Sequence, residues 1–415
     1  MNASAPRRVL IVSQSFYPSI GGVSTMLLNL CNLLVTNGHH VEAIHFAPQT
    51  HPGFVSALRP EVKVHQVSTA DFEPSVMAGY ARCKEHLYRH LHGLGGFDYT
   101  RMEEVPGYLE FQQVNSAFSV RLERLLSISK FDVVHVHDYQ LLEALHHARG
   151  PGVRRIVSLH APLLDSLSET LRNWFSHCLG GVDLLVLSTE EYARVAGQIR
   201  AAPVLSVLPP LAGTALPRLP TPPRDEDGCL RMLYVQRFDH KSGHEQLLHA
   251  FSRFSRQCPR ARLVLVGGAS FTDTISAERA GAAQRARDLV RELHLEHSVD
   301  FAGNVEYPSI FEEFVKSHIV CHLPKMECFG LAATEAMAHA RPVVATRVGG
   351  LAEQVDDGLT GVLVGVDDVD STVEALLMLA GDPHRRSCMG LAGYERYQRL
   401  YSASVVGRKY MELYA

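Results

Sequence analysis

Two glutamates flank a Phe-Gly turn in the segment KMECFGLAATEAMA, residues 325–338. The apolar run before the turn, IVCHLP, predicts a strand, and the small residues after it, LAATEAMAHA, predict a helix. The first amides of such a helix, at 329–331, have no partners within the helix and favour an anionic or hydroxyl-rich ligand. Glu327 and Glu335 can accept hydrogen bonds from hydroxyls. The segment therefore suits a molecule that carries hydroxyls and a phosphate, such as a sugar nucleotide.

Each glutamate alone is more simply explained as an exposed acid, which is the usual fate of this residue. The pair is more specific, because E-x-F-G stands in the strand–loop–helix context of a ligand site at the edge of a parallel sheet. Glu335 also lies in a helix that is otherwise nearly all Ala, Leu and Met. We therefore expect both carboxylates to face a ligand, with Gly330 allowing its close approach.

Two cations follow another apolar run, in the segment QRFDHKSG. Arg237 offers a fork of donors for an anion and Lys241 a point charge. A cation in a loop is otherwise an ordinary surface residue. Gly21 and Gly22 precede the first predicted helix, where bare backbone can approach a phosphate or simply make a turn.

Polar residues also end two predicted strands, VVHVHD and VSLHAP. Asp138 either faces the cleft that binds an acceptor substrate or caps the next helix. His160 lies at the same sheet edge, where a partly buried histidine is also ordinary. His135 and His137 are two apart on a strand and so point to one face. Since no third metal ligand is evident in the sequence, we expect a structural role for these two histidines.

The elements that position these residues alternate between short apolar runs and helical patterns. This alternation predicts an α/β fold with parallel, doubly wound sheets. The Pro-rich segment 209–228 is the one clear linker, and it separates domains at 1–208 and 229–400. Residues 71–107 show no clean periodicity and are predicted to be a long loop. Arg82 and Lys84 make this insertion a candidate acceptor-recognition element, and a mobile surface loop is the alternative.

Composition narrows the class of protein. The chain of 415 residues exceeds the usual size of a single core. A formal net charge of −4 argues against a general nucleic-acid binder. The eight dispersed cysteines lack a C-x-x-C pair, which indicates reduced thiols. The N-terminal segment lacks a signal-peptide core and no stretch is apolar enough for a membrane span, so we expect a cytoplasmic protein without membrane contact.

The segment ECFGLAATE resembles the E-x7-E motif of the retaining GT-B glycosyltransferases of family four, the glycogen- and sucrose-synthase-like group. The resemblance covers almost the whole chain, since QSFYPSIGGVSTMLLNLCNLLVTNG, FDVVHVHD, VLSTEEYA, RLVLVGG and ARPVVATRVGGLAEQ follow in that family's order. It implies the GT-B fold, in which two Rossmann-like domains face a central cleft. Residues 1–208 would bind the acceptor and 229–400 the nucleotide sugar. The helix over 401–415 would cross back to the first domain.

The resemblance also implies roles at the opening segment. Glu335 would hold the ribose hydroxyls of the donor, and Glu327 would contact the hydroxyls of the donor sugar. Backbone amides would lie near the sugar and the phosphates, at Phe329, Gly330 and Leu331.

Further roles are implied outside that segment. Arg237 and Lys241 would clamp the diphosphate, although their spacing of four is one residue shorter than is usual in the family. Gly21 and Gly22 would lie against the diphosphate and the acceptor. His160 would border the donor sugar.

The implied reaction is a retaining, front-face transfer in which the leaving phosphate helps to deprotonate the acceptor hydroxyl. No D-x-D motif stands in a suitable loop, so we expect no metal and no cofactor beyond the nucleoside diphosphate sugar, which is a co-substrate. UDP-linked glucose or N-acetylglucosamine is the expected donor. No sustained Lys/Arg face marks a membrane-binding helix, which favours a soluble acceptor such as a sugar, a cyclitol or a natural-product aglycone.

Other functions remain open at this point. A glycoside phosphorylase would depend on inorganic phosphate, and a sugar-nucleotide epimerase would act without an acceptor. A non-catalytic sugar-nucleotide-binding protein is disfavoured by the intact set of acids and cations. A dinucleotide-dependent oxidoreductase is disfavoured because no G-x-G-x-x-G follows the first strand.

Overall fold

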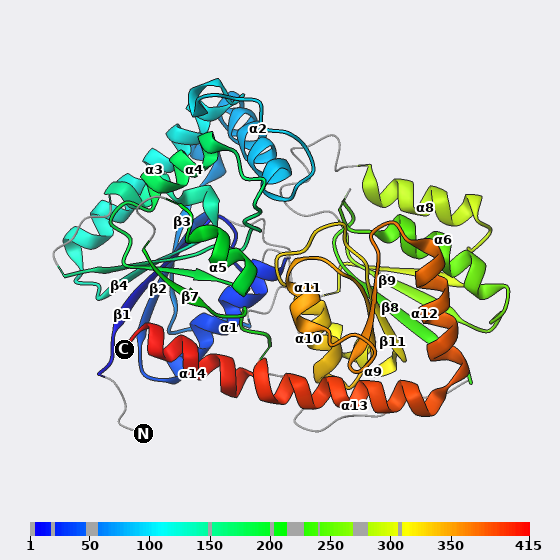
Figure 1. Ribbon diagram of the computed structural model, residues 1–415. Coiled ribbons are helices and arrows are strands. Elements are labelled where there is room, and N and C mark those ends of the chain that lie inside the picture. Colours follow the sequence, from blue (N-terminus) through cyan, green and yellow to red (C-terminus); the bar gives the residue numbers. More distant parts are fainter. Residues whose placement is uncertain are drawn as a thin grey trace. The chain divides into compact units, whose positions relative to one another are not determined.

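The computed structural model describes residues 5–17, 21–46, 57–147, 152–199, 203–213, 228–239, 241–268, 281–305 and 309–415. The chain forms two compact units (Figure 1). The first unit comprises Met1–Ser19, Val23–Pro210 and Gly407–Ala415, and the second comprises Ile20–Gly22 and Leu211–Val406.

The first unit is built on a seven-stranded parallel sheet with the strand order β3-β2-β1-β4-β5-β6-β7. Its strands are β1 (Arg8–Ser13), β2 (His40–Phe46), β3 (Lys63–Val67), β4 (Val133–His137), β5 (Arg154–Ser158), β6 (Leu184–Leu187) and β7 (Val204–Val207). Its helices are α1 (Gly22–Thr36), α2 (Pro74–Leu91), α3 (Tyr108–Ile128), α4 (Glu169–Cys178) and α5 (Glu190–Ala196), together with the part of α14 (Ala403–Leu413) from Gly407 onward. Short 3₁₀ turns occur at Thr69–Asp71, Met102–Glu104, Tyr139–Leu141 and Glu143–His147.

The second unit contains a six-stranded parallel sheet with the order β10-β9-β8-β11-β12-β13. Its strands are β8 (Arg231–Val235), β9 (Arg262–Val266), β10 (Val299–Gly303), β11 (Ile319–His322), β12 (Val343–Thr346) and β13 (Gly361–Val364). Its helices are α6 (His244–Ser255), α8 (Ala282–Glu292), α9 (Ile310–Lys316), α10 (Leu331–Ala338), α11 (Gly349–Gln354), α12 (Val369–Gly381) and α13 (Pro383–Leu400).

Both faces of the second sheet are covered by helices. Along β8, Met232 and Tyr234 pack in one apolar cluster with α6, α8 and α12. Leu233, between them, packs in the other cluster with α9, α10, α11 and α13. Successive strand residues point to opposite faces, so a strand buried on both sides reads as a continuous apolar run. The predicted α/β class, with two doubly wound domains, is confirmed.

Each sheet has one point at which the order of its strands reverses. In the first unit this point lies between β1 and β4, and in the second it lies between β8 and β11. Ligands of open parallel sheets bind at such a point, beyond the carboxyl ends of the strands. The loops that follow β8 and β11 carry the predicted donor residues. The loops that follow β1 and β4 carry Gly21–Gly22 and Asp138.

The prediction of a long loop over 71–107 is wrong, because an 18-residue helix, α2, occupies half of this segment. Pro74 stands at its first turn, where a missing amide costs nothing. The buried face of α2 includes Lys84 and His90 beside Tyr80 and Leu87. These polar residues interrupt the apolar stripe, which is why the sequence did not reveal a helix.

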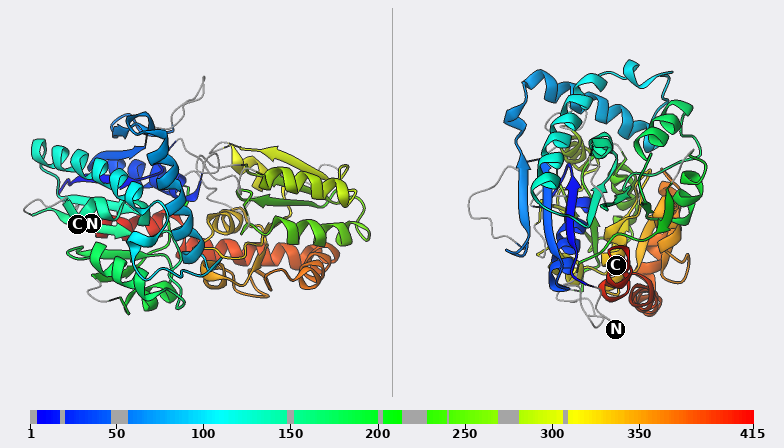
Figure 2. Two further views of the ribbon diagram at one scale, coloured as in Figure 1. Left: turned by 90° about the horizontal axis from the view of Figure 1, so that it is seen from above. Right: turned by 90° about the vertical axis from the view of Figure 1, so that its left-hand side faces the viewer.

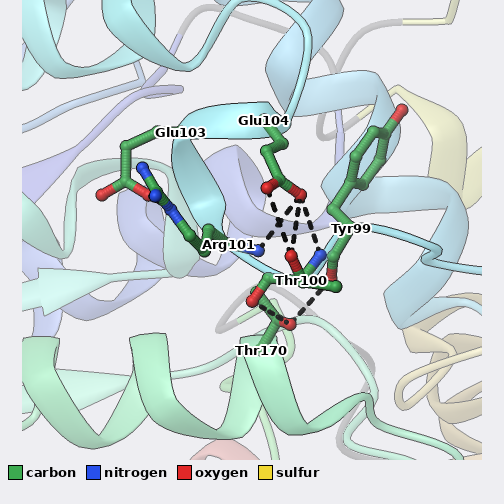
Figure 3. A network of polar contacts seen from close by, with 6 residues as sticks. All are labelled: Tyr99, Thr100, Arg101, Glu103, Glu104 and Thr170. Atoms are coloured by element: carbon green, nitrogen blue, oxygen red, sulfur yellow. Dashed lines mark hydrogen bonds and ion pairs between the residues drawn. The ribbon is translucent and has the colours of Figure 1, made fainter.

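Beyond α2, residues 99 and 100 of this insertion are hydrogen-bonded to α4. The hydroxyl of Thr170 donates to the carbonyl oxygens of Tyr99 and Thr100, over 2.7 and 3.1 Å (Figure 3). The carboxylate of Glu104 accepts hydrogen bonds from the amide of Thr100, at 3.0 Å, and from its hydroxyl. Residues 99–104 are therefore an ordered part of the first unit.

The end of the chain also packs into the first unit, where the C-terminus lies beside the strands (Figure 2). Arg154 donates from Nη1 to the carbonyl oxygen of Leu413 over 2.6 Å, and the ring of Tyr414 is completely buried. Of the predicted linker 209–228, residues 214–227 lie outside the described residues.

Candidate active site

The loop between β11 and α10 presents bare backbone amides at the strand reversal of the second sheet. Gly330 precedes α10 with φ at 94°, a conformation that side chains rarely adopt. A Cβ there would lie 2.6 Å from Cδ2 of Leu351 and 3.4 Å from Nε2 of His322. The amides of residues 329–332 have no acceptor within the described part of the chain. Glycine at this position is therefore required by both conformation and space.

The carboxylate of Glu327 is held over this loop. Its Oε1 accepts a hydrogen bond from the amide of Cys328 at 3.1 Å. Its Oε2 lies 3.4 Å from Nε2 of His322 and 3.4 Å from Nε2 of Gln236. With 18% of its side chain exposed, Glu327 remains accessible to a ligand.

His322 and Gln236 are functional candidates that the sequence reasoning missed. They stand at or directly after the ends of the switch strands β11 and β8. Neither ring nitrogen of His322 makes a hydrogen bond to a described residue, and neither does Oε1 of Gln236, although all three atoms are buried. A polar residue that closes an apolar run was the signal that could have found them.

Glu335 is a carboxylate buried in α10. Its side chain is 8% exposed and makes no hydrogen bond or ion pair with any described residue. Burial raises the pKa of its carboxyl to about 8. An acceptor that is desolvated and unpaired, one turn into α10, gains strongly from a ligand hydroxyl that donates to it.

Arg237 and Lys241 lie in the loop after β8, next to the Glu327 loop. Arg237 is half-buried and Lys241 is 7% exposed. The amide of Lys325 donates to the carbonyl oxygen of Lys241 over 2.7 Å, which joins the two loops. The structure thus brings the two predicted cations and the predicted acids to one edge of the second sheet.

The short spacing between these cations is accommodated by a tight turn. Oδ1 of Asp239 accepts from the amide of Lys241 at 3.0 Å, and the carbonyl oxygen of Asp239 accepts from the amide of Ser242 at 3.2 Å. His240 lies outside the described residues. Lys241 is therefore fixed at its backbone on both sides.

In the first unit, His160 and Asp138 are in contact. Oδ1 of Asp138 lies 3.3 Å from the backbone amide of His160, which donates to it. Asp138 has φ at 71°, a strained value for a non-glycine residue, and its Oδ2 accepts from Gln140. Burial lowers the pKa of the His160 imidazole, and the charge of Asp138 opposes that shift. Nε2 of His160 lies 3.0 Å from Nδ1 of His137.

The two glycines follow β1, the other switch strand of the first sheet. Gly21 has φ at 147°, which again favours glycine, and Gly22 is the first residue of α1. Residues 18–20 before them lie outside the described part of the chain.

Arg82 and Lys84 do not share a surface. Two residues apart on α2, they point in nearly opposite directions, so Arg82 is exposed and Lys84 is 9% exposed. Nζ of Lys84 lies 5.9 Å from the ring centre of Tyr80. The hydroxyl of Tyr80 donates to Oε1 of Gln14, just beyond β1, over 3.0 Å. Of the two cations, Lys84 is the one whose surroundings reach the carboxyl edge of the first sheet.

The described ranges contain no group of three or more His, Cys, Asp or Glu side chains placed to hold a metal ion. They also contain no helix that is long and apolar enough to cross a membrane.

Both halves of the chain match family models of sugar-transferring enzymes. Residues 20–210 match Glycosyltransferase Family 4, and residues 224–396 match Glycosyl transferases group 1. A D-inositol 3-phosphate glycosyltransferase from Corynebacterium aurimucosum is 26% identical over 414 residues, which cover 95% of this chain and 91% of that relative.

Shorter alignments reach higher identity. A D-inositol 3-phosphate glycosyltransferase from Kribbella flavida is 33% identical over 176 residues, 41% of this chain and 40% of the relative. An alpha-maltose-1-phosphate synthase from Mycolicibacterium smegmatis is 32% identical over 194 residues, 44% of this chain and 46% of the relative. These two alignments span less than half of the relatives' length.

Solved structures share the fold over nearly the whole chain. Sucrose-phosphate synthase from Thermosynechococcus elongatus superposes with a TM-score of 0.72 at 22% identity, covering 98% of both chains. A UDP-forming trehalose-phosphate synthase from Burkholderia xenovorans gives 0.73 at 18% identity, covering 99% of this chain and 98% of the other. With these matches to both of its halves, the chain belongs to the family-four-like glycosyltransferases of the GT-B type.

Proposed function

We propose that this glycosyltransferase moves a hexose-type sugar, with retention at the anomeric carbon, from a UDP-linked donor to a hydroxyl of a small soluble acceptor. The observation that carries this proposal is the buried carboxylate of Glu335, which has no partner among the described residues. It lies one turn into a helix whose first amides also have no acceptor among those residues. This arrangement matches a ligand with vicinal hydroxyls next to a diphosphate. Glu327 provides a second acceptor for the hydroxyls of the transferred sugar.

The proposed donor follows from this second unit and from its relatives. UDP-forming trehalose-phosphate synthase is among the proteins that share the fold. The ribose hydroxyls of UDP would donate to Glu335, and the amides of residues 329–332 would bind its phosphates.

The proposed acceptor is a sugar or a cyclitol. Curated relatives along the whole chain are named D-inositol 3-phosphate glycosyltransferases. In the first unit, Asp138 and His160 provide polar atoms for hydroxyls at the carboxyl edge of the sheet.

The proposed reaction forms no covalent intermediate with the protein and needs no side chain as its general base. The bond between the anomeric carbon and the β-phosphate oxygen breaks while the acceptor oxygen bonds to the same face of that carbon. The acceptor proton passes to the leaving phosphate oxygen. Arg237 and Lys241 stabilise the charge that develops on the diphosphate, and no metal is required for that step.

Thermal unfolding with UDP, GDP, ADP and dTDP tests the donor site. A ligand at about one hundred times its dissociation constant should stabilise the folded state by roughly 2.7 kcal/mol. We expect UDP to raise the unfolding temperature of the wild type, and Glu335→Ala to lose most of that increase. Glu374→Ala is the control, because Glu374 is an exposed helical glutamate of the same unit. If none of the four nucleotides raises the unfolding temperature, the proposed donor site is wrong.

A further inference from the structure

A chain of buried histidines connects the C-terminal segment to His160 in the first unit. Nδ1 of His135 lies 2.6 Å from the hydroxyl of Tyr414, and its Nε2 lies 2.7 Å from Oγ of Ser158. The ring centres of His135 and His137 are 3.9 Å apart. The rings of His137 and His160 are nearly parallel, at 7°, with centres 5.3 Å apart. Of these histidines, only His160 takes part in the proposed reaction.

The two inner histidines are neutral. His135 and His137 are fully buried. Burial lowers the pKa of His135 to about 3 and that of His137 well below its usual value. Each neutral imidazole carries one N–H, so the hydrogen bond between His137 and His160 has a defined direction.

That direction follows from the second nitrogen of His137. Nε2 of His137 is buried and has no hydrogen-bond partner in the described chain. A buried N–H without an acceptor is rarer than a buried acceptor without a donor. Nε2 is therefore the unprotonated nitrogen, and Nδ1 of His137 carries the hydrogen and donates it to Nε2 of His160 over 3.0 Å.

This direction determines which ring nitrogen of His160 carries the hydrogen. With its Nε2 accepting, the neutral His160 carries its hydrogen on Nδ1. That nitrogen is not among the buried unpaired atoms and has no partner among the described residues. It is the ring atom that a ligand can reach, and it presents a donor. The backbone of His160 is held separately, since its amide donates to Asp138.

We propose that His137 is a positioning residue that fixes His160 as the Nδ1–H tautomer, so that His160 donates a hydrogen bond to a substrate oxygen and does not act as a base. This role rests on the proposed function only for its substrate. The tautomer itself is a property of the protein without any ligand.

The tautomer can be measured directly by NMR on protein with ¹⁵N-labelled histidine rings. We expect the wild type to show a hydrogen on Nδ1 of His160, with its resonances assigned by their loss in His160→Gln. His137→Phe keeps the stacked ring and removes the donor, so Nδ1–H should lose its dominance. His137→Asn can place an amide N–H near the same position and should restore it. An Nε2–H tautomer in the wild type, or an unchanged tautomer in His137→Phe, would overturn the proposal.

Transfer kinetics give the second readout. We expect His137→Phe to lower kcat on the order of tenfold to a hundredfold, with the acceptor KM little changed and most activity recovered in His137→Asn. His39→Phe is the control, because His39 is also buried and hydrogen-bonded, to the amide of Arg7 at the opposite edge of the same sheet. Equal losses in His137→Phe and His39→Phe would indicate a structural role and contradict positioning. If the wild type transfers no sugar at all, the proposed function fails, while the NMR result still decides the tautomer.

Discussion

Gly243 lies directly against the carbonyl oxygen of Leu323, so closely that a Cβ at position 243 would overlap that oxygen. Gly243 also has φ at 66°, in the left-handed region. Gly243 follows Lys241, and Leu323 begins the segment that leads to Glu327. This contact therefore sets the distance between the loop with the two cations and the loop with the first acid.

Gly243→Ala should separate these two loops. The substitution combines steric overlap with an unfavourable backbone conformation, so we expect a loss of more than about 2 kcal/mol in the free energy of unfolding. Binding of nucleotide should weaken with it, as measured by urea unfolding and calorimetry. Gly381→Ala is the matched control, since a Cβ there meets nothing within 4 Å, and this variant should be neutral or slightly more stable. Equal effects of the two variants would contradict the importance of the contact.

Glu335→Gln should change how stability depends on pH. The folded-state pKa of about 8 exceeds the ordinary value of 4.5, so between these pH values the folded protein holds a proton that the unfolded chain has lost. Stability from this group is complete below pH 4.5 and falls as the pH rises towards 8. The glutamine variant does not lose stability in this way. As the pH rises, its free energy of unfolding should therefore exceed that of the wild type by a growing margin, up to a few kcal/mol, at about 1.4 kcal/mol per pKa unit.

Unfolding midpoints of both proteins at pH 5 and pH 8.5 check this expectation. A constant difference between the two proteins across that range would show that the pKa of Glu335 is not raised. Addition of UDP at pH 8.5 should stabilise the wild type more than Glu335→Gln, because the ribose hydroxyls would donate to the ionised carboxylate.

Arg237→Ala and Lys241→Ala should weaken binding of the diphosphate specifically. Hydrogen bonds to charged groups contribute about 1.5–3 kcal/mol, so each variant should bind UDP roughly ten- to a hundredfold less tightly. Competition by uridine, which lacks phosphate, should be unchanged. Arg262→Ala is the control, because this exposed arginine begins β9 and so lies at the amino ends of the strands, away from the proposed site. Equal weakening of UDP and uridine would place the two cations away from the phosphates.

Thr170→Val should loosen the insertion over residues 99–104. The valine keeps the shape of threonine and removes the hydroxyl that donates to Tyr99 and Thr100 (Figure 3). We expect a loss of about 1 kcal/mol in stability and faster limited proteolysis between residues 92 and 107. Ser127→Ala, which removes a local hydroxyl bond at the end of α3, should leave proteolysis in that segment unchanged.

Local sequence patterns were sufficient for most of the architecture. Apolar runs such as RVLIVS and RLVLV are strands because they are buried on both faces of a parallel sheet. Glu327 and the two cations were also found locally, since each stands in a loop next to such a strand, and Glu335 stands in the helix that follows the Glu327 loop. These predictions depend on residues within a few positions of one another.

Burial of polar residues could not be predicted in this way. On α2, Lys84 and His90 lie on the buried face because α2 packs on α3, and its Tyr80 contacts Gln14 and Phe46 at the ends of β1 and β2. The sequence alone therefore suggested a loop with two equivalent cations. The structure separates Arg82 from Lys84 because neighbouring elements cover only one side of the helix.

By itself, the sequence determined the alternation of strands and helices and the residues offered at each loop, because both follow from local spacing. Only the tertiary structure decided which of these residues meet. Gln236 reaches Glu327 because β8 and β11 are neighbours, although 91 positions separate the two residues. Tyr414 reaches His135 across 279 positions. Such contacts depend on which strands pair and on where the C-terminal segment packs. The free energy of burial that selects these arrangements comes from the whole fold and not from any local stretch of sequence.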